Sequence, residues 1–256
     1  MADGGSTDGT STMVRHEFPD VKLVRGPREE YYVQAVNRGY AESCGDYVLV
    51  VQSDIQVVEG AVARLLAFME SSLQTAACSC RLLTTSTGKL QWTNAHFLTL
   101  TSEIFEWTRF GWVFPSIRRN LRSLRYMESW DRSDNREVDV NVSNFMLFRR
   151  KAIEEVRLGG GPFDNRLIMF FAEDELCWRL RKAGWKIYHL GDTFVYHIGS
   201  FSMGKLNSGF LGTLSLKDRL ECHAIVLGPI RAQIFRSIYR MDSIMTAILK
   251  LCNVIQ

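Results

Sequence analysis

Residue types typical of fibrous, disordered or membrane-spanning proteins are scarce in this chain. Its 256 residues include only 5 prolines and 19 glycines, which excludes a collagen-like or linker-like chain. No uncharged apolar run approaches the roughly 18 residues of a membrane-spanning helix. No basic segment followed by an apolar run marks a signal peptide. A net charge of +3 is too small for this length to indicate nucleic acid as a partner.

Common catalytic and metal-binding motifs are also missing. No G-x-S-x-G, P-loop lysine or H-E-x-x-H motif occurs. The sequence therefore gives no support for a hydrolase with a catalytic serine or for nucleotide hydrolysis at a P-loop. Among the 6 cysteines, only Cys78 and Cys80 are close in sequence, and no second pair or nearby histidine completes a zinc site. We interpret the cysteines as structural thiols and expect a cytoplasmic protein.

The chain does contain alternating strand-like and helix-like segments. The run 47–51 is almost wholly apolar, as in a strand buried on both faces. This alternation predicts an α/β fold with a mostly parallel sheet flanked by helices. The expected strands cover 21–24, 47–51, 76–83, 138–149, 186–190 and 193–197, and the expected helices cover 29–43, 60–72, 151–156 and 173–183.

Two segments depart from this alternation. Residues 98–135 are rich in arginine and aromatic residues, and we interpret them as a less regular lid or acceptor-facing insertion. From Ile230 onward, apolar residues on one helical face predict a C-terminal amphipathic helix. Docking on the domain or pairing with another subunit is favoured over contact with an anionic membrane. We therefore expect a domain over 1–220 and a helical tail over 221–256. The apolar stripe comprises Ile234, Phe235, Ile238, Met241, Met245, Ile248, Leu249 and Cys252.

Three polar clusters could lie at the C-terminal ends of strands, where an open parallel sheet binds its ligands. In the opening loop, from Asp3 to Thr10, glycines allow close backbone approach, and Asp3 could accept hydrogen bonds from a base or ribose. Such a loop is by itself more often a turn or a helix cap. Asp54 either ends its strand or holds a divalent cation that bridges a diphosphate.

A third cluster is acidic. Residues 173–175 open a predicted helix, where acids favour the helix dipole or one of them deprotonates an acceptor hydroxyl. His197 follows a short strand and is either structural, the commoner case, or a ligand of a metal or phosphate.

Taken in order, these segments resemble the family 2 glycosyltransferases of the rhamnosyltransferase-like branch, which have a GT-A fold. Residues 3–10 look like the family's "DNGSTDGT" segment, and 46–54 resemble its "DYVLLLNPD" strand and metal-site motif. Residues 138–150 are similar to a strand that often ends in "VSGAFMLFRR". Residues 161–164 and 173–185 match "GGFDERFF" and "EDVDLCWRLRKAGW", and 195–199 resemble the late His/Gly segment.

The resemblance implies sugar transfer, with inversion, from a nucleotide-diphosphate sugar to a glycan or lipid-linked acceptor in cell-surface polysaccharide or glycan synthesis. It implies a divalent cation, Mg²⁺ or Mn²⁺, held by Asp54 and His197. The catalytic base would be Glu173, with Asp174 as the second choice. Peripheral contact with the inner face of the membrane, or an oligomer, would form through the C-terminal helix. The implied donor-binding residues are Asp3, Gly5, Ser6, Asp8, Ser53 and Asn144.

This sequence departs from the family pattern at four places, one of them a mild change in which Gln52 and Ser53 replace the Asn-Pro pair before Asp54. The family's first strand and helix do not precede Met1, so the donor-binding half is expected to be incomplete. Ser143 and Asn144 replace a Gly-Ala pair and would crowd the sugar site. The acidic motif is shifted, with Glu173 in the usual Asp position and Ala172 in the preceding Glu position. The alternative function is therefore a non-catalytic binding or scaffold protein that keeps the fold without a complete donor site.

Overall fold

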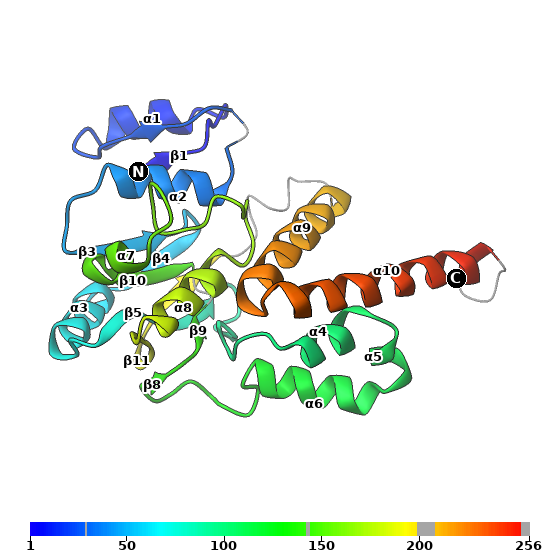
Figure 1. The fold of residues 1–256 in the computed structure, drawn as a ribbon. Coiled ribbons are helices and arrows are strands. Elements are labelled where there is room, and N and C mark those ends of the chain that lie inside the picture. The colour runs from blue at the N-terminus through cyan, green and yellow to red at the C-terminus, as the bar shows by residue number, and fades with distance from the viewer. Residues whose placement is uncertain (29, 142–143, 199–207, 252–256) are drawn as a thin grey trace.

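A mixed β-sheet with helices on both faces forms the core of the protein (Figure 1). The computed structural model describes residues 1–28, 30–141, 144–198 and 208–251. Within them, the main sheet has the strand order β3-β10-β5-β11-β4, with β6 paired to β5 and β8 paired to β11. Its strands are β3 (Tyr47–Val51), β4 (Ile55–Val57), β5 (Thr75–Thr84), β6 (Leu90–Gln91), β8 (Arg136–Glu137), β10 (Phe145–Arg149) and β11 (Lys186–His197).

The expected α/β fold is confirmed, but the sheet is mixed and not mostly parallel. Strand β11 pairs parallel with β5. Strand β10 is inserted between β3 and β5 and runs antiparallel to both, so β3, β5 and β11 share one direction. The run 47–51, expected to be a strand buried on both faces, is β3, which lies at the edge of the main sheet with its side chains partly buried or exposed. An apolar run indicates a strand but not its place in the sheet, because strand order depends on pairings between distant segments. Strand β11 also joins the two short strands expected near its ends, with an irregular register between Leu190 and Phe194.

Side-chain alternation divides the core into two apolar clusters, one on each face of the sheet. On β10, Phe145 and Leu147 pack in the cluster that contains Leu65 and Met69 of α3. Met146 and Phe148 point to the opposite face and pack in the cluster formed with α2, α7 and α8. The described cysteines form no disulfide: Cys44 is exposed, and Cys78, Cys80, Cys177 and Cys222 are buried.

Ten helices accompany the described strands, and the sequence locates several of them well. The expected helix over 60–72 is observed as α3, and α8 ends as expected just before Gly184, whose φ of 89° suits the turn that follows. The helices are α1 (Thr10–Glu17), α2 (Tyr32–Ala41), α3 (Ala61–Ser71), α4 (Leu100–Trp107), α5 (Phe110–Val113), α6 (Pro115–Arg125), α7 (Arg150–Val156), α8 (Ala172–Lys182), α9 (Ser208–Val226) and α10 (Pro229–Leu251).

Two short ladders lie outside the main sheet. Strands β1 (Ala2–Asp3) and β2 (Val24–Arg25) pair in parallel near the N-terminus. Strands β7 (Asn94–Ala95) and β9 (Val140–Asn141) pair antiparallel, with Asn94 opposite Asn141.

The segment expected to be irregular, 98–135, is mostly helical. Helix α4 begins with a capping box in which Thr99 Oγ1 accepts from the Ser102 N–H at 3.1 Å. Helix α6 begins with Pro115, which suits the first turn of a helix. Helix α4 packs against α6 and α10, so this segment forms a helical region at the end of the molecule away from the sheet (Figure 1).

Helices α9 and α10 close this helical region. The expected boundary at 220/221 falls inside α9, and Cys222 and Val226 belong to the core cluster. The expected amphipathic helix is observed as α10, which packs on α9 and α4. Its predicted apolar stripe is divided: Phe235 is buried, whereas Ile234, Met241, Met245 and Ile248 are exposed, and Cys252 lies outside the described residues.

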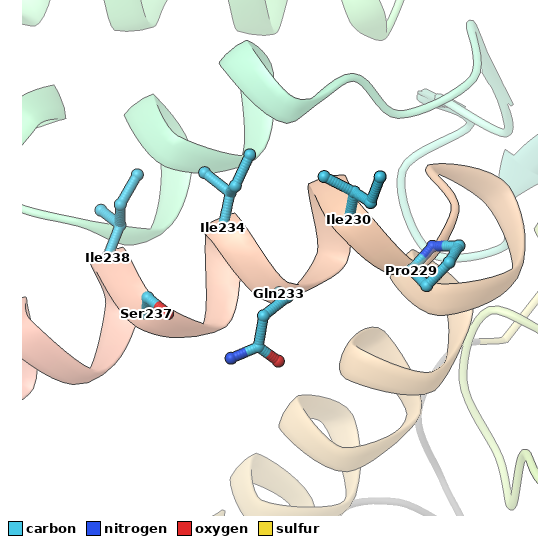
Figure 2. Close-up of a pocket in the computed structure, with 6 residues that line it drawn as sticks. All are labelled: Pro229, Ile230, Gln233, Ile234, Ser237 and Ile238. Atoms are coloured by element: carbon cyan, nitrogen blue, oxygen red, sulfur yellow. The ribbon is translucent and has the colours of Figure 1, made fainter.

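The exposed side of α10 includes a shallow apolar groove. Ile230, Ile234 and Ile238 project from the same side of the helix, and Gln233 points the other way (Figure 2). Among the described helices, none is both long enough and apolar enough to span a membrane.

Candidate active site

Asp3 lies at the end of β1 and organises the loop that follows it. Its carboxylate accepts hydrogen bonds from the Ser6 N–H at 3.0 Å and from the Ser11 hydroxyl, and Arg25 Nε lies 3.8 Å away. Burial raises the pKa of Asp3, but the hydrogen bonds from Ser11 and Ser6 and the charge of Arg25 outweigh it and lower the pKa to about 2. Asp3 is therefore ionised at neutral pH and holds the opening loop in shape.

The other residues of this loop also have local contacts. Gly5 has a φ of 87°, and a Cβ there would lie 2.6 Å from the Pro27 carbonyl oxygen, so the position favours glycine. The Asp8 carboxylate accepts from the Thr10 N–H at 3.2 Å and the Thr10 hydroxyl at 2.6 Å at the start of α1. The loop is thus a compact turn between β1 and α1.

Asp54 and His197 meet at one edge of the sheet. Asp54 lies just after β3, and His197 is the last residue of β11. Asp54 Oδ2 is 3.1 Å from His197 Nε2, and the same nitrogen is 3.0 Å from Asn144 Nδ2. Ser53 is exposed beside this group, and Ser143 lies outside the described residues. The structure thus brings together Asp54, His197 and Asn144, which are far apart in the sequence.

Gln91 on β6 determines which nitrogen of His197 faces Asp54. Gln91 Nε2 donates to Thr84 Oγ1 at 2.9 Å, and Gln91 Oε1 is 2.8 Å from His197 Nδ1. Because an amide oxygen only accepts, Nδ1 donates to Gln91, and Nε2 is the nitrogen that faces the Asn144 amide and Asp54 Oδ2. Sequence reasoning missed Gln91, since no motif marks it.

The residues at this edge fit a divalent cation. Asp54 Oδ1 is buried without a hydrogen-bond partner among the described residues, and the other oxygen of this carboxylate lies 3.1 Å from His197 Nε2. Two electron-rich groups this close are stabilised by a cation. The described residues hold no cluster of three or more metal-ligating His, Cys, Asp or Glu side chains. Cations that bridge phosphates need only one or two protein ligands, because the phosphates supply others.

Glu173 lies in the first turn of α8 and is buried beside a tyrosine. The Tyr32 hydroxyl donates to Glu173 Oε1 at 2.6 Å, and Gln52 in turn hydrogen-bonds Tyr32. Burial raises the pKa of Glu173 to about 7, although the Tyr32 hydrogen bond opposes it. Gln52 lies two residues before Asp54, so this carboxyl is linked to the edge that holds Asp54. Tyr32 is a second residue that no sequence motif indicated.

Asp174 has a different environment from its neighbour, as expected for adjacent helical residues about 100° apart. Its Oδ1 lies 3.9 Å from Arg125 Nη2. Arg125 also binds Glu103, whose other carboxylate oxygen contacts Arg219 and, at 2.8 Å, His223 Nε2. Asp174 therefore faces a buried charge network that joins α4, α6, α8 and α9.

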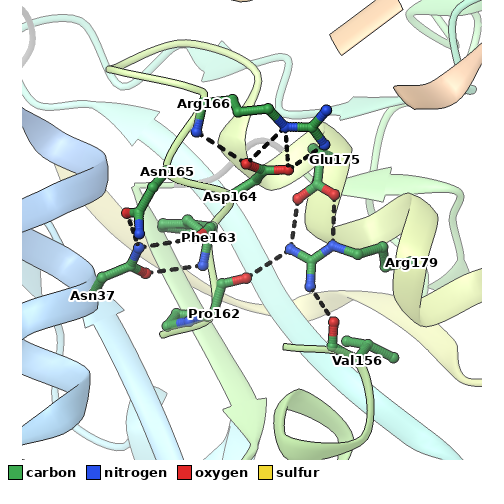
Figure 3. Close-up of polar contacts among 9 residues, drawn as sticks. All are labelled: Asn37, Val156, Pro162, Phe163, Asp164, Asn165, Arg166, Glu175 and Arg179. Atoms are coloured by element: carbon green, nitrogen blue, oxygen red, sulfur yellow. Dashed lines mark hydrogen bonds and ion pairs between the residues drawn. The ribbon is translucent and has the colours of Figure 1, made fainter. Parts of the chain in front are cut away.

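A polar framework fixes the loop before α8 (Figure 3). Asn37 on α2 accepts from the Phe163 N–H at 2.9 Å and donates to the Phe163 carbonyl at 2.9 Å. Glu175 accepts two hydrogen bonds from Arg179, both 2.5 Å long, and Arg179 also donates to the Pro162 carbonyl at 2.7 Å. These contacts join α2, the 162–165 loop and α8.

Asp218 of α9 binds the residues immediately before α8. Its carboxylate accepts from the backbone N–H groups of Ile168, Met169 and Phe170 at 3.0, 2.8 and 2.8 Å. Asp218 is fully buried. The position of Glu173 therefore depends on a residue that the sequence alone placed in no site.

A mixed central sheet flanked by helices on both faces is the architecture of the GT-A glycosyltransferases. The sequence profile of Glycosyl transferase family 2 matches residues 1–157. The chain belongs to this family and is a transferase enzyme.

Individual relatives agree with this assignment. The chain is 27% identical over 216 residues to the N-acetylglucosaminyl-diphospho-decaprenol L-rhamnosyltransferase of Mycobacterium tuberculosis, covering 80% of this chain and 67% of the relative. Its fold resembles that of glucosyl-3-phosphoglycerate synthase from the same species, crystallised with Mn²⁺, UDP and glucosyl-3-phosphoglycerate. That match has a TM-score of 0.51 and 13% identity, and it covers 89% of this chain and 68% of the synthase.

The fold also resembles that of GalNAc-T7, crystallised with UDP, GalNAc and Mn²⁺. This match has a TM-score of 0.50 and 14% identity. It covers 75% of this chain but only 35% of GalNAc-T7.

Proposed function

We propose that this protein transfers a sugar from a nucleoside-diphosphate sugar to an acceptor hydroxyl, with inversion at the anomeric carbon. The observation that carries the proposal is the buried carboxyl of Glu173, linked through Tyr32 and Gln52 to the sheet edge where Asp54 meets His197. A general base with a pKa near 7 suits proton removal at neutral pH. Family membership supports the same reaction.

In the proposed step, Glu173 accepts the proton of the acceptor hydroxyl. The acceptor oxygen forms a bond to the anomeric carbon while the bond from that carbon to the diphosphate oxygen breaks, and its electron pair leaves with the diphosphate. Attack from the face opposite the leaving group inverts the anomeric centre. Tyr32 orients the Glu173 carboxylate through its hydrogen bond.

Asp54 and His197 are the residues that would hold a divalent cation. Gln91 accepts from His197 Nδ1 and so leaves Nε2 as the ligating nitrogen, where the cation would take the place of the Asn144 contact. A bound Mg²⁺ or Mn²⁺ would neutralise charge on the departing diphosphate. Asn144, Ser53 and the 3–8 loop are the proposed donor-binding residues. Both structural relatives were crystallised with Mn²⁺, which supports a cation in this role.

The test is Glu173→Gln, which keeps the shape of the side chain and removes the base. We expect a loss of transfer of roughly a thousandfold, with calorimetric binding of UDP or GDP in Mn²⁺ unchanged. Glu154→Gln is the matched control, because Glu154 also accepts a hydrogen bond from a tyrosine, Tyr40, but lies on α7. Full activity in the Glu173 variant would refute its role. Absence of any nucleotide binding by the wild type would instead favour the scaffold alternative.

We further propose a lipid-linked acceptor reached at a membrane surface. The rhamnosyltransferase relative has a decaprenol-linked substrate in its name. In the helical region, Trp112 and Val113 of α5 are 73% and 67% exposed, and Met241 of α10 is 71% exposed. Residues 100–125 contain five arginines and two glutamates. Exposed aromatic and apolar side chains beside cations favour an anionic lipid surface.

Co-sedimentation with vesicles of anionic and of neutral lipid tests this contact. We expect binding to anionic vesicles only, lost in the double variant Trp112→Ser with Val113→Ser. Leu73→Ser is the control, since Leu73 is equally exposed at 74% but lies beyond α3. Equal binding by all three proteins would exclude this surface, and dimerisation that the double variant abolishes would assign it to a second copy.

A further inference from the structure

Helix α8 begins at a residue with an unusual backbone conformation. Phe171, which occupies the N-cap position, has φ and ψ of 61° and 10° and so lies in the left-handed region. Helices α1 and α3 also begin after left-handed residues, but those are Gly9 and Gly60, which adopt this conformation without a steric cost. For a bulky side chain the conformation is strained, and such strain persists only where surrounding contacts maintain it.

Phe171 also lacks the kind of side chain that stabilises a helix N-terminus. Ser, Thr, Asp and Asn are preferred at this position because their oxygens accept hydrogen bonds from backbone N–H groups of the first turn. The Phe171 ring accepts no such bond, although its carbonyl accepts the first helical one, from the Glu175 N–H at 3.0 Å. Helix capping and intrinsic preference therefore do not explain a phenylalanine in this conformation.

Two adjacent residues of α9 maintain the conformation. Asp218 binds the three backbone N–H groups that precede Phe171, and Arg219 contacts the ring. The Arg219 Cζ atom lies 4.7 Å from the centroid of the Phe171 ring and 3.7 Å from that of Trp107 on α4. Arg219 is itself fixed by its ion pair with the buried Glu103. The ring and the backbone before it are thus both bound by α9.

The loop before α8 also contacts the helix that carries the partner of the base. The Ile168 carbonyl accepts a hydrogen bond from the Val33 N–H at 3.1 Å. Val33 follows Tyr32, whose hydroxyl binds Glu173. The loop is therefore joined to Tyr32 through α2 and to Glu173 through Phe171. The turn at Phe171 determines how these two side chains, which are far apart in the sequence, meet.

We propose that Phe171 is a positioning residue for the general base. Its left-handed conformation directs the first turn of α8 so that the Glu173 carboxyl is buried against the Tyr32 hydroxyl, and Asp218 and Arg219 maintain that conformation. This inference rests on the proposed function, because it concerns the base assigned there. It adds that α9 of the helical region sets the geometry of a base that lies beside the sheet.

Phe171→Ala and Phe171→Gly separate the backbone conformation from the ring. Both variants remove the ring, but only glycine adopts the left-handed region freely. In Phe171→Ala we expect kcat to fall about 10- to 100-fold. The increase of kcat/KM with pH should also move to lower pH, because burial raises the pKa of Glu173 and a less buried carboxyl loses that effect. In Phe171→Gly both kcat and the pH profile should stay near those of the wild type.

Asp218→Asn tests the same turn from α9. The amide NH₂ that replaces one carboxylate oxygen cannot accept, so at least one of the three N–H groups loses its acceptor. We expect the pH profile to move in the same direction as in Phe171→Ala. Calorimetric binding of UDP or GDP in Mn²⁺ should be unchanged in every variant, which verifies that the donor-binding half is folded.

Met69→Ala is the control for a general loss of stability. Met69 is fully buried in the cluster on the other face of the sheet, so its truncation should lower the Tm without moving the pH profile. A profile that stays in place in both Phe171→Ala and Asp218→Asn, or moves equally in the alanine and glycine variants of Phe171, overturns the positioning role alone. Full activity of Glu173→Gln would instead overturn the proposed function and this inference with it.

Discussion

A glutamate is buried beside the sheet and another is buried in the helical region, and the pKa values of their carboxyl groups are shifted in opposite directions. Glu173 on α8 has a tyrosine hydroxyl as its side-chain partner, and burial raises its pKa to about 7. Glu103 on α4 is also buried, but its pKa is lowered to about 2. Burial also opposes ionisation of Glu103, yet His223, Arg219 and Arg125 outweigh it.

The difference teaches that burial alone does not decide whether an acid is reactive. Without a cation, the carboxyl of Glu173 exchanges its proton near neutral pH, which suits a base. With two arginines and a histidine, the carboxylate of Glu103 stays charged and holds helices together. The two carboxyls are connected through the start of α8, where Asp174 lies 3.9 Å from the arginine that binds Glu103.

The largest expected effect comes from breaking the Glu103 network. Glu103→Gln leaves two buried arginines without their carboxylate, and we expect a loss of about 3–5 kcal/mol in the free energy of unfolding. Urea denaturation measures it. Glu106→Gln is the control, because the Arg118–Glu106 pair is partly exposed at 3.6 Å and should contribute less than about 1 kcal/mol. Equal losses of unfolding free energy in the Glu103 and Glu106 variants would contradict the view that the buried network contributes more than the exposed pair.

The same network predicts how stability depends on pH. A pKa lowered from 4.5 to about 2 means that the unfolded chain binds the Glu103 proton more readily. The stabilisation is therefore present above pH 4.5 and lost as pH falls toward 2. The loss should be about 3 kcal/mol in the wild type and absent at this site in Glu103→Gln. Parallel stability curves for the two proteins over this range would show that Glu103 does not contribute.

A smaller effect is expected at the cation site. Gln91→Leu removes the acceptor that keeps the proton on His197 Nδ1, and we expect Mn²⁺ affinity in the presence of UDP to fall about 10- to 100-fold. Gln91→Glu retains an acceptor oxygen and should restore most of the affinity. Calorimetry or electron paramagnetic resonance of Mn²⁺ measures the Mn²⁺ affinity without requiring turnover. An unchanged affinity in Gln91→Leu would exclude Gln91 from this role.

The smallest expected effect is a shift in the pKa of Glu173, which would widen its difference from the pKa of Glu103. Tyr32→Phe removes the hydrogen bond that lowers the pKa of Glu173, so the pKa should rise above 7 by up to about one unit. Because a base acts when deprotonated, the increase of kcat/KM with pH should move to higher pH. Tyr40→Phe, at the Tyr40–Glu154 pair, should leave the profile in place. A shift to lower pH would contradict the assignment.

The sequence predicts much of the sheet region because local patterns there have local causes. The apolar run 47–51 and the helix over 60–72 are observed within a residue of their expected bounds. The insertion of β10 between β3 and β5 was not predictable, because strand order depends on pairings between distant segments. The three helices within 98–135 were missed, although Thr99 and Pro115 are signals of helix N-termini.

Within the candidate site, sequence identifies residues that lie in motifs and misses those that act on them. Asp54 and His197 were expected together and are 3.1 Å apart. Tyr32 and Gln91 occupy ordinary helix and strand positions, and their contacts with Glu173 and His197 arise only from tertiary packing.

Asp218 has a consequence for how the protein is made. The carboxylate that binds the backbone of residues 168–170 lies 50 residues downstream of Ile168. On the ribosome, the sheet emerges first and the loop before α8 is left without its anchor until α9 has been synthesised. The contact that anchors the backbone before α8 can therefore form only after all the strands of the main sheet have been synthesised.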